Sequence, residues 1–134
     1  RRLVKNKARD IVKRYGPRGE LAELCFTLET DGRLIQFMLP ARVDRVEKVL
    51  MDEVRRPRPD TKKRVKGQAE RTAWKLLSDW VDVQLSLVEL GQVEFMEVFL
   101  PYVFDAAKHQ TFFEHMKESG YRLLPAPGGV NERS

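Results

Sequence analysis

Positively charged residues in two short stretches carry most of the chemistry that this sequence could perform. Residues 55–66 hold seven Lys or Arg against one Asp, and residues 1–18 hold eight against one, whereas the remaining residues are net acidic. Guanidinium groups bind phosphate oxygens in pairs, and ammonium groups act as mobile point charges. Charge separated so sharply indicates a surface that binds a polyanion, and the phosphate backbone of DNA or RNA is the leading candidate.

Pro57 and Pro59 lie inside the first of these stretches and exclude a continuous helix there. We therefore expect an exposed, extended connector, followed by a helix that Asp60 or Thr61 caps. Cations in the first turn of that helix repel each other and the helix dipole, at a cost of about 0.3–1 kcal/mol each, which a bound anion would relieve. A solvated linker is the alternative interpretation. The candidate phosphate-binding residues of the connector are Arg55, Arg56, Arg58, Lys62, Lys63, Arg64 and Lys66.

The second basic stretch has the spacing of an amphipathic helix over residues 2–15. Apolar residues from Val4 to Tyr15 recur on one face, and Gly16-Pro17 would end the helix. The opposite face would carry four cations in a row roughly 16 Å long. We expect this row to lie beside the connector, so that the two form a single cationic surface. The candidate residues of the row are Arg2, Lys5, Arg9 and Lys13.

Other reactive side chains give weaker signals. Trp74 lies off the apolar face of its predicted helix and is a candidate for stacking on unpaired bases, whereas Trp80 lies on that face and is assigned to the core. His109 and His115 do not share a helical face and lack neighbouring ligands, so we expect no metal site and no other cofactor. The single cysteine, Cys25, is expected to be a small buried hydrophobe. With no nucleophile motif or phosphate-binding glycine loop, we predict a non-enzymatic protein.

Among the elements that position these residues, a β-hairpin has the strongest signal in the sequence. Two alternating runs are joined by Asp31-Gly32, a dipeptide favoured in type I′ turns because both central residues need positive φ. This turn predicts a register in which Phe26 faces Phe37 and Leu24 faces Leu39 on the apolar face. Because two strands alone are not stable, we expect a helix to pack on that face.

Helices are predicted on both sides of the connector. The first runs from a capping box at Asp44 and Glu47 to about Val54, and the second, of about 29 residues, runs from Thr61 almost to residue 91. Two short helices follow. One covers the apolar residues 95–100 and stops at Pro101, and the other begins with a capping box formed by Thr111 and Glu114.

Together these elements predict one α+β domain over residues 1–124, with an N-terminal helix, one β-hairpin packed on a long helix, additional short C-terminal helices and an exposed basic connector at 55–66. Residues 125–134 are rich in Pro and Gly and predict a disordered tail. No apolar run approaches the ~20 residues of a membrane-spanning helix, and no signal-like leader opens the chain. We therefore expect a soluble, cytoplasmic protein with no membrane partner.

Four segments of this chain carry a resemblance to known proteins: IVKRYG at residues 11–16, RLIQFMLP at 33–40, RTAWK through VQLSLVE at 71–89, and FLPY at 99–102. In this order they resemble a family of small uncharacterised proteins encoded in bacteriophage and prophage genomes. The genes of this family resemble neighbours of phage genes for DNA metabolism, which favours a role with nucleic acid. The resemblance implies the cytoplasm of a bacterial host as the location, and it implies no catalytic residues.

Two functional hypotheses of different classes follow. The leading one is a non-enzymatic accessory protein that binds DNA or RNA through phosphates, using both basic patches, with weak sequence selectivity. The alternative is a phage-type adaptor or inhibitor that docks a host or partner protein through its acidic surface or through the hydrophobic residues 95–104. The combination of strongly positive and strongly negative regions also suits a homo-oligomer.

Overall fold

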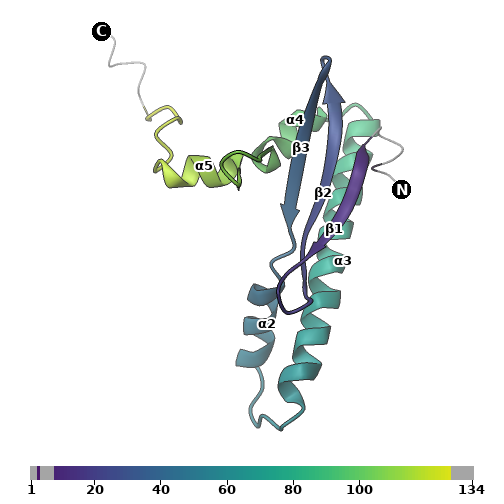
Figure 1. The fold of residues 1–134 in the computed structure, drawn as a ribbon, viewed down its shortest axis with the longest axis vertical. Coiled ribbons are helices and arrows are strands. Elements are labelled where there is room, and N and C mark those ends of the chain that lie inside the picture. Colours follow the sequence, from purple (N-terminus) through teal and green to yellow (C-terminus); the bar gives the residue numbers. More distant parts are fainter. Residues whose placement is uncertain (1–2, 4–7, 128–134) are drawn as a thin grey trace.

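A computed structural model describes Leu3 and residues 8–127, and its fold is α+β, as predicted (Figure 1). A three-stranded antiparallel sheet has the order β1-β2-β3, and a second sheet consists of β4 and β5. The elements are β1 (Arg9–Tyr15), β2 (Leu21–Thr30), β3 (Arg33–Pro40), α2 (Val43–Asp52), α3 (Thr61–Glu89), α4 (Phe95–Phe99), the 3-10 helix η1 (Leu100–Tyr102), β4 (Phe104–Asp105), β5 (Gln110–Thr111) and α5 (Phe112–Glu118).

The β2–β3 hairpin has the predicted register. Phe26 pairs with Phe37 and Leu24 pairs with Leu39, in an unbroken ladder from Glu23 to Thr30 of β2. The turn residues Asp31 and Gly32 both have positive φ, at 52° and 77°. These values are those that a type I′ turn requires, so the turn chemistry and the apolar alternation agree on one register.

The predicted N-terminal helix is wrong over residues 9–15, which form the strand β1 antiparallel to β2. The register shifts between Arg9 and Val12, where Asp10 has a φ of 55°. This irregularity breaks the period-two pattern that would have indicated a strand. β-branched Ile11 and Val12 suit a strand, and pairing with the edge of β2 satisfies backbone N–H and C=O groups on both strands. Residues 1–2 and 4–7 of the predicted helix lie outside the described part of the chain.

The main core lies between the sheet and the C-terminal half of α3. Phe26 and Phe37 stack with ring centroids 5.2 Å apart, and Phe99 meets the Phe26 ring edge-on at 6.2 Å. Val81 and Leu85 of α3 belong to the same buried cluster as these aromatic residues. Trp80 packs edge-on against Phe99 at 5.5 Å, so its predicted place in the core is confirmed.

A second cluster joins the N-terminal half of α3 to α2. Ala69 and Ala73 of α3 are buried in one cluster with Val43, and Val46 and Leu50 of α2 pack against it. The predicted long helix is confirmed over its full length of 29 residues. The predicted capping box of the preceding helix is wrong, because the residue that precedes α2 is Arg42, in a left-handed conformation and with no side-chain cap hydrogen bond.

The C-terminal elements form an arm that projects sideways from the upper end of the sheet (Figure 1). α4 and η1 occupy the predicted short helix and end around Pro101, and β4 and β5 were not predicted. The predicted capping box of α5 is confirmed, since the Thr111 hydroxyl accepts from the Glu114 N–H at 3.1 Å and Glu114 accepts from the Thr111 N–H at 2.7 Å. Residues 128–134 of the predicted tail lie outside the described part.

Candidate nucleic-acid interface

The connector between α2 and α3 lies at the far end of the long axis of the molecule, away from the sheet (Figure 1). The N-terminal half of α3 and the whole of α2 extend beyond the sheet as a helical hairpin, and the connector forms its end. Six of the predicted phosphate-binding cations are exposed there, and we call them the basic tip: Arg55, Arg56, Arg58, Lys62, Lys63 and Arg64.

Thr61 fixes the backbone of the basic tip. Its hydroxyl accepts from the Arg58 N–H at 2.7 Å, and its own N–H donates to the Arg58 carbonyl at 3.0 Å. Thr61 is only 1% exposed, so these bonds are shielded from water. The residue before α3 is Asp60, as predicted, but the Asp60 side chain makes no cap hydrogen bond. The connector is thus an ordered turn in which Thr61 joins the proline-containing segment to the helix.

The basic tip retains its positive charge. Within the described part of the chain, the ion pairs join Arg9, Arg14, Lys48 and Lys75 to carboxylates, and no ion pair involves a residue of the basic tip. Residues 53–66 contain seven cations and only two carboxylates, Glu53 and Asp60. Lys66 is turned away from this group, because its ammonium donates to the Arg18 carbonyl of the β1–β2 turn at 3.0 Å.

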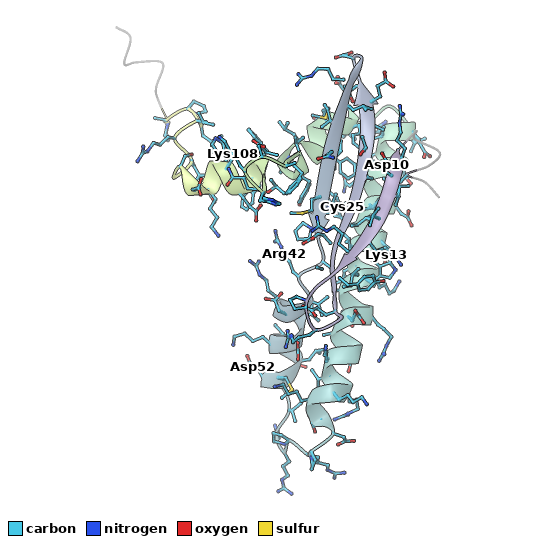
Figure 2. The ribbon with its side chains drawn as sticks, in the orientation of Figure 1. Asp10, Lys13, Cys25, Arg42, Asp52 and Lys108 are labelled. Carbon is cyan, nitrogen blue, oxygen red and sulfur yellow. The ribbon has the colours of Figure 1, made fainter. Side chains whose placement is uncertain are left out.

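The other predicted cationic row does not join the basic tip. Arg2 and Lys5 lie outside the described residues, and Arg9 and Lys13 lie on β1, beside the sheet. Figure 2 shows Asp10 and Lys13 along this strand, whereas Asp52, at the end of α2, lies much nearer the connector. Arg9 is also paired with Glu29 at 2.9 Å. The prediction of one continuous cationic surface is therefore wrong for the described members of the row.

The Trp74 side chain is partly covered by other residues. The Lys13 ammonium lies 3.9 Å from the centre of its ring, which is a cation–π contact. Trp74 is half-buried and packs against both hydrophobic clusters. It also borders a cavity of about 570 Å³ between β1 and α3, lined in addition by Ile11 and Val81. Lys13 thus occupies one of the two ring faces on which a base could stack.

The remaining candidates for chemistry are dispersed. Cys25 is free and half-buried on β2, and burial, followed by the charge of Glu23, raises the pKa of its thiol. The His115 Nδ1 lies 3.1 Å from the Gln110 amide, and the described residues contain no group of three or more His, Cys, Asp or Glu that could hold a metal ion. Sequence analysis named Thr61 only as a cap, and the contact between Lys66 and Arg18 had no local signal, because the two residues are 48 positions apart.

No protein-family model, curated protein or solved structure matches this chain. The resemblance to phage proteins therefore stays a prediction. Among the described helices, none is long and apolar enough to cross a membrane.

Proposed function

We propose that the protein is a non-enzymatic accessory protein that binds nucleic acid through the phosphate backbone, using the basic tip alone. The hypothesis drawn from the sequence requires the two basic segments to form one surface. Because β1 lies apart from the connector, we limit the proposed site to the basic tip. One observation above all supports this narrower proposal: six cations without ion pairs gather on the connector and the first turn of α3, at the end of a projecting helical hairpin.

The chemistry of the basic tip suits phosphates. Three arginines on the turn offer planar forks for paired phosphate oxygens, and Lys62, Lys63 and Arg64 add charge at the N-terminus of α3, where backbone N–H groups also favour an anion. Such contacts position a protein on the backbone without reading bases. The proposal therefore predicts weak sequence selectivity and strong dependence on salt.

A salt-titrated binding assay tests this proposal. Fluorescence anisotropy with labelled single- and double-stranded DNA and RNA should show log affinity falling linearly with log salt concentration. If about six phosphates are neutralised on a duplex, the slope is about −5. Affinity that does not change with salt would contradict phosphate binding.

A matched pair of variants tests the location of the site. Serine at all six positions of the basic tip should abolish binding while leaving the melting temperature nearly unchanged, because these side chains are exposed. The control replaces six exposed cations elsewhere by serine and reaches the same net charge, yet should retain most of the binding. Equal losses in the two variants would reject the basic tip as the site. The control positions are Arg33, Arg45, Arg71, Lys108, Lys117 and Arg122.

The adaptor hypothesis has less support at the surface that first suggested it. Phe99 is fully buried, and Phe95 stacks on it with centroids 4.3 Å apart. Phe99 thus belongs to the main core, and Phe95 and Tyr102 pack against it. Leu100 is the exception in this segment, at 44% exposed, and the other exposed large apolar residues of the described part lie outside it.

A further inference from the structure

The helical hairpin that carries the basic tip contains no aromatic side chain. Residues 38–73, which include all of α2, the connector and α3 as far as Ala73, have no Phe, Tyr, Trp or His. Proteins that bind single-stranded nucleic acid without reading its sequence combine a positively charged groove with aromatic side chains on which successive bases stack. The hairpin therefore supplies the charge for such binding but not the aromatic platforms.

Most of the exposed aromatic residues in the described part of the chain lie in the C-terminal arm. Phe112 and Phe113 begin α5 and Tyr121 follows it, and the three are 36%, 40% and 42% exposed. The arm projects from the upper end of the sheet, whereas the basic tip lies at the far end of the helical hairpin (Figure 1). A strand held at the basic tip by its phosphates therefore has its bases far from these rings.

Two further aromatic residues lie where α3 passes beside β1. Trp74 is the first aromatic residue of α3, ten positions beyond Arg64 of the basic tip, or about 15 Å along the helix. The Lys13 ammonium covers one face of its ring. Tyr15, at the end of β1, is 59% exposed and borders a cavity of about 200 Å³ together with Trp74. Neither ring belongs to the connector or to the first turn of α3.

A duplex suits the basic tip better than a single strand does. Duplex DNA carries one phosphate charge per about 1.7 Å of its axis, whereas each strand alone carries one per about 3.4 Å. Hydrogen bonds between Arg58 and Thr61 order the connector, and a duplex is rigid, so the two lose little conformational freedom when they associate. A flexible single strand must be ordered on binding, and the hairpin has no aromatic stacking contact that offsets this cost.

We propose that the basic tip selects double-stranded nucleic acid over single strands. This inference rests on the proposed binding of phosphates and narrows it to one class of nucleic acid. DNA and RNA duplexes share the feature that the tip recognises, which is a pair of phosphate backbones held in a fixed geometry. The bases take no part in the binding.

Fluorescence anisotropy with four labelled probes of equal length tests the selection. They are a DNA duplex, an RNA duplex, a single-stranded thymidine oligonucleotide and a strand with abasic sugars at every position. Each has about 20 nucleotides per strand, which exceeds the site size of typical single-strand binders. At about 50 mM salt, a duplex should bind at least tenfold more tightly than either single strand. The two single strands should agree within about twofold, because the tip has no aromatic ring on which a base could stack.

The possible results separate this inference from the proposed function. A thymidine strand that binds as tightly as the duplexes, or about tenfold more tightly than the abasic strand, would overturn the selection while leaving phosphate binding in place. Tight binding of only one of the two duplexes would support the selection and identify DNA or RNA as the partner. No binding to any of the four probes would reject the proposed function itself.

A pair of variants tests the role of aromatic residues directly. Tyr15→Leu removes the most exposed aromatic ring of the described part and should leave the melting temperature and the affinity for all four probes nearly unchanged. The serine variant of the basic tip should instead lose affinity for all four. A loss in Tyr15→Leu that is confined to the thymidine strand would show that bases stack beside β1, and it would overturn the proposal.

Discussion

Arg58 and Thr61 hold each other through two hydrogen bonds across the turn that carries the basic tip. The Arg58 N–H donates to the Thr61 hydroxyl at 2.7 Å, and the Thr61 N–H donates to the Arg58 carbonyl at 3.0 Å. The threonine is almost completely buried, so water cannot easily replace its hydroxyl. One buried side chain thus orders a segment whose own side chains are nearly all exposed.

Thr61→Val is expected to lower both stability and nucleic-acid affinity. The substitution keeps the shape of the side chain but leaves the Arg58 N–H without its partner, at a cost of about 1–2 kcal/mol. Thermal unfolding should show a decrease of roughly 4–8 °C. Thr61→Ser retains the hydroxyl and should keep the affinity. If the valine variant binds nucleic acid as tightly as the wild type, the order of the turn is irrelevant to binding.

Lys13→Met is expected to destabilise the protein slightly by removing the cation above Trp74. A cation–π contact of this kind contributes about 0.5–1 kcal/mol at a partly exposed site, and methionine preserves most of the apolar stem. Urea unfolding followed by tryptophan fluorescence measures the change. Lys108→Met, at an exposed lysine distant from both tryptophans in the chain, serves as the control. Equal midpoints for wild type and Lys13→Met would show that the contact carries no stability.

The elements that sequence analysis predicted correctly share a local signal. The β2–β3 hairpin joins turn residues that need positive φ to an alternating apolar pattern, and α3 repeats its apolar residues at helical spacing over many turns. In both cases the conformation that the backbone prefers also buries the apolar side chains. The Thr111–Glu114 capping box of α5 likewise depends on residues three positions apart.

The errors occur where distant residues decide the outcome. Residues 9–15 have helical spacing, yet they form β1 because the edge of β2 is available, and the irregularity at Asp10 hides the strand period. All seven residues of β1 are exposed, so this strand has no alternation of buried and exposed positions that would mark it in the sequence. The position of the basic tip relative to β1 depends on how far α3 extends beyond the sheet, and helical periodicity alone does not contain this information.

Cys25 is expected to react slowly with alkylating reagents at pH 8. Burial and the Glu23 carboxylate raise the pKa of the thiol above its usual value of 9.0, so less thiolate is present than in the unfolded chain. Iodoacetamide should therefore modify the folded protein more slowly than the same protein in urea, and Glu23→Gln should accelerate the reaction. Comparable rates in folded and unfolded protein would contradict the raised pKa.

The same pKa shift predicts a dependence of stability on pH. Because the folded protein holds the thiol proton more tightly, its contribution to stability is complete below the unfolded pKa, near 9.0, and is lost as the pH rises through the raised folded pKa. The free energy of unfolding should thus decrease over this alkaline range. Cys25→Ser should lack this part of the decrease, and identical pH profiles for the two proteins would argue against it.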